Sequence, residues 1–174
     1  MSYTLEVCVD STASALAAKR GGASRLELCA DLIIGGTTPS LALLQQVKAE
    51  TGLPVRALLR PRFGDFCYDH YELAQMEQCA AQLVAAGADG IVTGVLTADG
   101  ALDADALRPL YAAARQAAQQ AHRPVDCTLH RAFDLCRDPF AALEAARALG
   151  LSTILTSGQA ASAPAGAELL GQLV

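Results

Sequence analysis

The sequence has no Cys-x-x-Cys pair, no clustered run of lysine and arginine, and no apolar stretch of the roughly 20 residues that a bilayer span needs. The first absence argues against a zinc ribbon or a thioredoxin-type redox motif. The second, with a formal net charge of -5 and a pI near 5.1, argues against a nucleic-acid-binding surface. The third argues against a membrane partner, and residues 1–6 lack a signal peptide's basic and apolar regions. We therefore expect a cytoplasmic protein.

The chain is large enough to fold without covalent crosslinks. It has 174 residues and is 52% hydrophobic, so residues 1–174 are expected to form a single domain with its own core. Its six cysteines are expected to remain free thiols, because a reducing compartment does not favour disulfides. Any metal site must therefore be assembled by the fold.

Short strand-like runs alternate with longer runs of helical period, which predicts an α/β fold with parallel strands joined by crossover helices. The strands are expected at residues 4–9, 25–28, 55–60, 90–93, 125–130 and 153–156. The helices are expected at residues 12–20, 40–50, 71–86, 103–120, 138–149 and 166–173.

The repetition of this unit favours a barrel over an open sheet. Glycine-containing turns recur between helix and strand at residues 22–25, 86–90 and 149–152, and no Gly-x-Gly-x-x-Gly follows the first strand. A complete TIM-type (β/α) barrel has eight units in about 250 residues. This chain supplies about six, so we expect a truncated barrel whose C-terminal units are missing. Because open strand edges need cover, we also expect a homodimer or a larger homo-oligomer.

The segment 60–68 is the clearest candidate for a site. Arg60, Arg62 and Asp65 follow directly on a strand-like run and are interleaved with aromatic residues. A strand that serves only packing would end in a short turn, whereas this one opens into a loop with forked cation donors.

Side-chain alternation along the strands predicts which residues face the barrel interior. In the first strand, Leu5, Val7 and Val9 form an apolar row for the helices, which leaves Glu6, Cys8 and Asp10 facing inward. The same alternation turns Arg25, Glu27 and Cys29 inward from the second strand, and Asp126, Thr128 and His130 inward from the fifth.

These inward residues have a structural interpretation and a functional one. Glu6, Arg25 and Glu27 could simply neutralise one another as a buried network. Cys8 and Cys29 could be small buried apolar residues, and His130 could be structural. The functional interpretation is that a charged interior is costly, and that His130 and Arg131 stand at the strand end where barrel active sites lie.

Six ordered segments, 5–11, 21–29, 60–68, 90–97, 130–134 and 155–159, resemble the CutC copper-homeostasis family. The resemblance covers nearly the whole chain and implies a TIM-barrel architecture, a cytoplasmic location and a role in copper handling. It also implies that Cys8 and Cys29 hold Cu(I). The residues agree with this, because both thiols lie on inward rows of adjacent strands and soft thiolates suit Cu(I).

Two functional hypotheses follow, and the sequence leaves open whether the protein is an enzyme. The first is a homeostasis protein that binds copper as Cu(I) through Cys8 and Cys29. The second is an enzyme acting on a small anionic metabolite, a carboxylate or a phosphate. In the second hypothesis Glu27 or His130 serves as the acid or base, and the anion is held by Arg25, Arg60, Arg62 and Arg131, with Glu6, Asp65, Ser157 and Gly158 completing the pocket.

Overall fold

The computed structural model describes residues 3–174 and contains one six-stranded parallel sheet whose strands lie in chain order. The strands are β1 (Glu6–Val9), β2 (Arg25–Leu28), β3 (Val55–Leu58), β4 (Gly90–Thr93), β5 (Asp126–Leu129) and β6 (Thr153–Ile154). The α-helices are α1 (Thr12–Arg20), α2 (Leu41–Thr51), α3 (His70–Ala85), α4 (Ala104–Gln120), α5 (Pro139–Ala148) and α6 (Ala167–Leu173). Two short 3-10 helices, η1 (Leu32–Ile34) and η2 (Arg131–Leu135), were not predicted.

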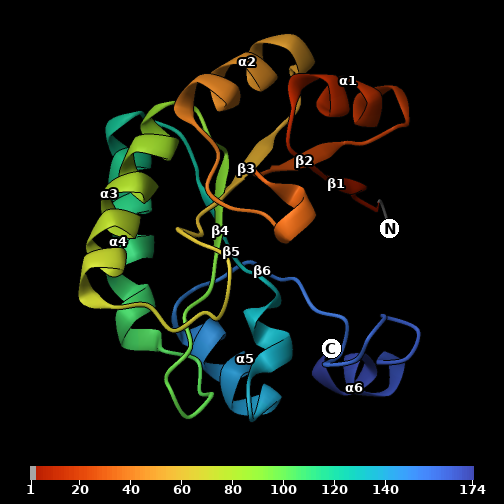
Figure 1. Ribbon diagram of the computed structural model, residues 1–174, viewed down its shortest axis with the longest axis vertical. Helices are drawn as coiled ribbons and strands as arrows, with labels where there is room; N and C mark the ends of the chain where they lie inside the picture. Colours follow the sequence, from red (N-terminus) through yellow and green to blue (C-terminus); the bar gives the residue numbers. More distant parts are fainter. Residues whose placement is uncertain (1–2) are drawn as a thin grey trace.

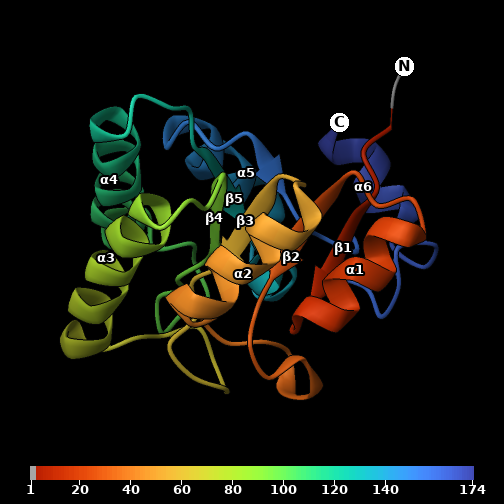
Figure 2. The ribbon, with the colours of Figure 1, turned by 90° about the horizontal axis from the view of Figure 1, so that it is seen from above.

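The sheet is curled, and the helices α1 to α5 form an arc around its outer side (Figure 1). The view from above shows the same arrangement, with α2 and α1 on one side of the strands and α3, α4 and α5 following around it (Figure 2). The predicted α/β class and the partial TIM-type barrel are therefore confirmed. Within residues 3–174 β1 and β6 are not paired with each other, so the sheet has two edges. No helix in these residues combines the length and the apolar character needed to cross a membrane.

Local sequence signals account for the helix boundaries. The Ser11 side chain accepts from Ser14 N and caps α1, and Asp138 accepts from Phe140 N and Ala141 N ahead of Pro139 at the start of α5. Gly52 ends α2 at a φ of 64°, a conformation that costs glycine little.

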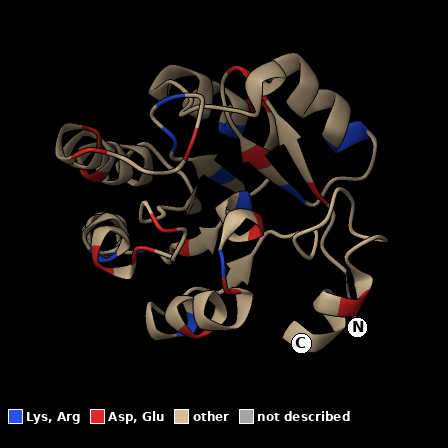
Figure 3. Ribbon diagram, turned by 60° about the horizontal axis from the view of Figure 1, so that its bottom comes forward, with Lys and Arg blue, Asp and Glu red and all other residues tan. Residues whose placement is uncertain are grey.

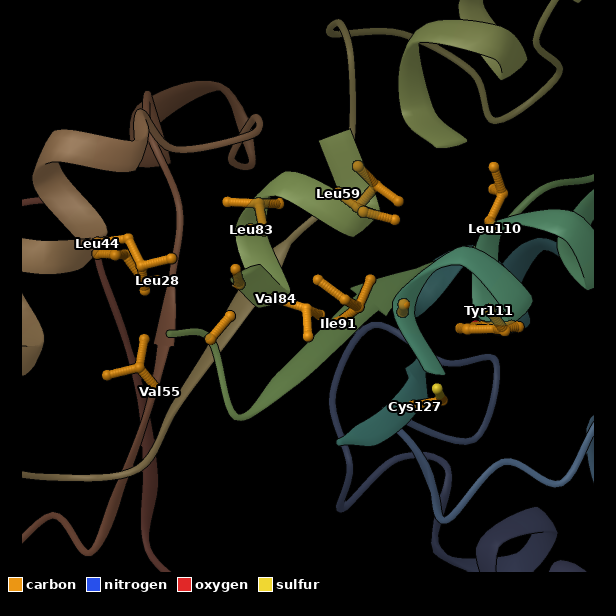
Figure 4. Close-up of a cluster of buried hydrophobic side chains, with 14 of the residues drawn as sticks. Leu28, Leu44, Val55, Leu59, Leu83, Val84, Ile91, Leu110, Tyr111 and Cys127 are labelled. Carbon is orange, nitrogen blue, oxygen red and sulfur yellow. The ribbon is translucent and has the colours of Figure 1, made fainter. Parts of the chain in front are cut away.

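The outward faces of the strands form the hydrophobic core against the helices. Leu28, Val55, Ile91 and Cys127 point from the strands toward α2, α3 and α4, where the buried Tyr111 is packed (Figure 4). Of the predicted outward residues, this core buries Val9, Leu26, Leu28 and Cys127, with Val7 and Val125 packed against it, whereas Leu129 is buried in a second cluster with Phe133.

Leu5 was expected under the helices, and this prediction is wrong because β1 begins only at Glu6. The Leu5 side chain is 51% exposed, while its carbonyl accepts from Ser24 N at the rim of the sheet, 3.0 Å away.

The inward face of the sheet is polar near the amino-terminal ends of the strands, which we call its lower half. Figure 3 shows acidic and basic residues on the strands themselves, inside the ring of helices. The register places Glu27 beside Arg56, Arg56 beside Gly90, and Gly90 beside Asp126. Gly90 thus leaves room for the Arg56 side chain to reach across β4 toward β5.

We expect Gly90→Ala to destabilise the protein by about 1–3 kcal/mol, because overfilling a packed interior forces side chains and backbone to move. The added Cβ would lie 2.8 Å from Arg56 Cγ and 3.1 Å from the Asp126 carbonyl oxygen. Gly171→Ala in α6 is the control, since its Cβ would meet nothing within 4 Å. Urea unfolding measures both variants, and equal stability of the two would contradict the role given to Gly90.

Candidate functional site

Arg56 organises the lower half of the interior. Its side chain is 3% exposed; Nη2 donates to Asp126 Oδ2 at 2.9 Å, and Nη1 donates to Thr128 Oγ1 at 2.9 Å and Thr153 Oγ1 at 3.3 Å. Glu6 Oε2 lies 3.8 Å from Nη1. A single guanidinium therefore contacts side chains of three other strands, and two carboxylates compensate its charge.

Glu6 and Arg25 belong to this lower network. They are cross-strand neighbours in β1 and β2, and Arg25 Nε donates to Glu6 Oε2. Both side chains are mostly covered, at 20% and 24% exposure. Neither residue lines the cavity at the carboxyl ends of the strands. Their ion pair matches the structural interpretation, in which these charges neutralise one another.

A cavity of about 160 Å³ opens above this network, at the carboxyl ends of the strands. Its polar lining is Cys8, Glu27, Cys29, Arg60, His130 and Arg131, and its apolar lining includes Leu32, Leu58, Phe66 and Leu155. We call this space the top cavity. It brings together six of the twelve site residues predicted from the sequence.

The two thiols enter the top cavity from adjacent strands. Cys8 is exposed on the open side of the sheet and donates to Glu27 Oε1 across 3.7 Å, whereas Cys29 is buried and donates to the Val9 carbonyl across 3.5 Å. Surrounding protein, and then the charge of Glu27, raise the pKa of both thiols above the ordinary value. Both are therefore protonated in the unliganded protein.

Glu27 is a buried carboxyl group whose pKa is shifted toward neutrality. Burial, followed by the charge of Glu6, raises its pKa from 4.5 to about 7, while the Cys8 hydrogen bond and Arg56 act in the opposite direction. Of the two predicted acid or base residues, Glu27 has the pKa better suited to proton transfer near neutral pH.

His130 is neutral and presents one ring nitrogen without a partner. Burial lowers its pKa from 6.5 to about 3, and its Nδ1 accepts from Ala132 N at 3.2 Å. Nε2 therefore carries the proton, yet it is buried with no hydrogen-bond partner. The ring is fixed by Phe66, 4.6 Å away between centroids, and by Gly94, where a Cβ would lie 2.7 Å from Nδ1.

Arg60 is the buried arginine that has no carboxylate partner within residues 3–174. Its Nη1 donates to the carbonyls of Gly35 and Gly36 at 3.2 and 3.1 Å, and Nη2 to the Gly64 carbonyl at 2.9 Å. The guanidinium carbon lies 4.9 Å from the centre of the Phe66 ring, and Nε is buried without a partner.

Arg62 and Asp65 do not line the top cavity. Arg62 donates to Asp65 Oδ1 at 3.1 Å, and its Nε donates to Glu72 Oε1 at 2.5 Å in the first turn of α3. These contacts fasten the 60–68 loop to α3. Of the two arginines in the loop, Arg60 therefore lines the cavity and Arg62 attaches the loop to the helix.

Asp134 anchors the loop after β6, and the sequence reasoning did not single it out as a site residue. Its carboxylate accepts from Arg131 Nε at 2.7 Å, Thr156 Oγ1 at 2.5 Å and Ser157 Oγ at 3.1 Å. Gly158 stands at a φ of 70° in the same loop. Ser157 and Gly158 do not line the top cavity, and Arg131 reaches it only from the rim.

Arg56 was also missed, because it lies within an otherwise apolar strand-like run, residues 54–59. The alternation applied to the other strands would have found it, since Arg56 and Arg60 fall on the same inward row. The unpartnered nitrogens of Arg60 and His130 have no sequence signal, because loop carbonyls occupy the Nη atoms of Arg60 and the Ala132 amide donates to Nδ1 of His130.

A larger cavity, about 440 Å³, lies elsewhere, between α5, β6 and α6. It is lined mainly by apolar residues such as Phe133, Leu143 and Leu173. It contains none of the buried unpartnered side-chain atoms found in the described residues. The chemistry of the interior is therefore concentrated in the smaller top cavity.

Comparison with known proteins identifies the relatives of this chain. A family model described as "CutC family" matches residues 3–174. A family protein CutC of Vibrio vulnificus is 47% identical over 174 residues, covering 100% of this chain and 67% of the relative. A copper homeostasis protein cutC homolog of Homo sapiens is 45% identical over 172 residues, covering 99% of this chain and 60% of the relative. The chain thus spans 60–67% of the length of these two relatives.

Solved structures support the same relationship. A CutC protein of Streptococcus agalactiae superimposes with a TM-score of 0.87 at 27% identity, covering 98% of this chain and 81% of that one. A 2,3-dimethylmalate lyase superimposes with a TM-score of 0.66 at 17% identity over 99% of this chain and 63% of that one, a likeness that shows the fold alone.

The buried His130 predicts a specific sensitivity to acid. Because its pKa is lower in the folded protein than in the unfolded chain, the unfolded chain binds more protons between about pH 3 and pH 6.5. Its contribution to stability is therefore full above pH 6.5 and is lost as the pH falls, by up to about 1.4 kcal/mol per pH unit. His130→Asn should remove this loss, because asparagine can still accept from Ala132 N but does not titrate.

The measurement is urea unfolding of wild type and variant at pH 6.5 and pH 5.0. We expect wild type to lose up to about 2 kcal/mol more than His130→Asn over this interval. His122→Asn is the control, because His122 is exposed and asparagine tolerates its φ of 52°. Equal acid losses in wild type and His130→Asn would contradict the buried neutral imidazole.

Proposed function

The chain belongs to the CutC family, and from this membership we propose that it acts in copper homeostasis by binding Cu(I) through the thiols of Cys8 and Cys29. The observation that carries the proposal is that both sulfur atoms line one cavity from adjacent strands. Cu(I) is treated as cargo, so the relevant chemistry is capture and release. The copper-homeostasis name of the human relative supports this assignment.

The donor set suits a soft monovalent ion. Thiolates select Cu(I), whereas hard divalent ions prefer oxygen ligands. Residues 3–174 contain no group of three or more His, Cys, Asp or Glu side chains arranged to hold a metal, so the proposed site uses two sulfurs. His130 would have to give up the Nε2 proton to join them, because Nδ1 already accepts from Ala132 N. Binding must also displace the two thiol protons.

We place the protein in the cytoplasm in this proposal. Thiol-dependent Cu(I) capture needs reduced cysteines, and a reducing compartment keeps them so. All six cysteines are unpaired in the structure.

Replacing Cys8 and Cys29 together with serine should weaken Cu(I) binding at least a hundredfold, because a hydroxyl is a hard and poorly ionised ligand. The assay is a titration of reduced protein with Cu(I) against a competing chelator. The control is Cys79→Ala with Cys127→Ala, two thiols that face the helices and lie outside the top cavity. Unchanged affinity in the Cys8 and Cys29 double variant would refute the two-thiol site.

We also propose that the chain forms a homodimer. Within the described residues β1 and β6 leave two sheet edges, and the apolar cavity beside α6 adds an uncovered surface. Light scattering should give twice the 18.0 kDa of one chain. Leu170→Asp, in that cavity, should lower the mass, whereas Ala167→Asp on the exposed face of α6 should not. A monomer at every concentration would refute the proposal.

A further inference from the structure

Arg60 leaves a buried positive charge without a compensating carboxylate. The residue is 7% exposed, and its guanidinium donates to loop carbonyls and lies over the Phe66 ring, with the neutral Tyr68 side chain nearby. Arg56 provides an internal comparison, because it is equally buried but lies beside Asp126 and Glu6. Uncompensated buried charges are costly and buried charges are normally paired, so Arg60 calls for an anionic partner.

A second donor in the same cavity has no acceptor. The Nε2 proton of His130 is buried and unpartnered, and so is the Nε proton of Arg60. Both residues line the top cavity. Leaving a buried donor without an acceptor is costly, so two such donors beside one small space indicate that an acceptor belongs there.

The size and walls of the cavity define the acceptor further. Its volume of about 160 Å³ corresponds to roughly five water molecules at about 30 Å³ each. Leu58, Phe66 and Leu155 form apolar walls. A ligand of a few heavy atoms with a polar head and a short apolar body fits this description.

We propose that the top cavity binds a small carboxylate anion whose oxygens accept hydrogen bonds from Arg60 Nε and His130 Nε2. Arg131 is already paired with Asp134, so the one uncompensated positive charge of Arg60 and the neutral donor of His130 match a single negative charge. A phosphate dianion would bring a second negative charge into a space that also contains Glu27. The site goes beyond copper binding, since it uses nitrogen donors rather than the sulfurs of Cys8 and Cys29.

The experiment is an NMR titration of the whole chain at pH 7 with acetate, pyruvate or inorganic phosphate, at constant ionic strength maintained with chloride. Acetate and pyruvate should bind saturably and shift the Nε2–H signal of His130. His130→Asn should weaken their binding at least tenfold, because a hydrogen bond to a charged group is lost. It retains an acceptor for Ala132 N and so tests the donor without removing the Arg60 contacts that hold three loop carbonyls.

A control variant and the use of copper-free protein separate this site from its surroundings. Arg147→Gln removes one positive charge from an exposed helix position and should leave carboxylate binding unchanged. The titration is made on copper-free protein, so the carboxylate site stands or falls independently of the copper site. Absence of saturable carboxylate binding, tighter binding of phosphate, or unchanged affinity in a folded His130→Asn would each overturn the proposal.

Discussion

The burial of Arg56 inside the curled sheet is the constraint on which the rest of the structure depends. A guanidinium that is 3% exposed must meet its acceptors within the protein, and here they come from β1, β5 and β6. These strands can supply them only if the sheet curls around the side chain and if β4 carries no side chain at Gly90. The lower interior is thus filled by a compensated ionic network in place of the branched apolar layers usual in such barrels.

The interior changes character toward the carboxyl ends of the strands. Arg60 lies four residues beyond Arg56, just past the end of β3, but is fastened by glycine carbonyls, which hold the guanidinium without neutralising it. Asp134 is occupied in anchoring the loop after β6 and Asp65 in anchoring Arg62, so neither carboxylate compensates Arg60. The loops therefore position the cavity and leave its positive charge free.

The fold and the directions of most site residues follow from local sequence rules, whereas their partners do not. Alternation along the strands correctly turned Cys8, Glu27, Cys29 and His130 inward, because the side-chain period of a strand is fixed by backbone geometry. The same rule failed at Leu5, which precedes the first ladder contacts of β1. The partners of Arg60 and Arg62 depend on loop conformation, and residue type does not specify it. The η2 helix, which directs the His130 ring through Ala132 N, was likewise not predicted.

The two proposed ligands make compatible demands on the cavity. A free Cu(I) ion in the cavity would be repelled by the positive charge of Arg60. In the two-thiol site, however, copper arrives with the loss of two thiol protons, so one positive ion and two thiolates carry a net charge of about -1. The bound complex is therefore an anion, as a carboxylate is. A buried guanidinium without a carboxylate partner favours an anion beside it, whichever of the two is bound.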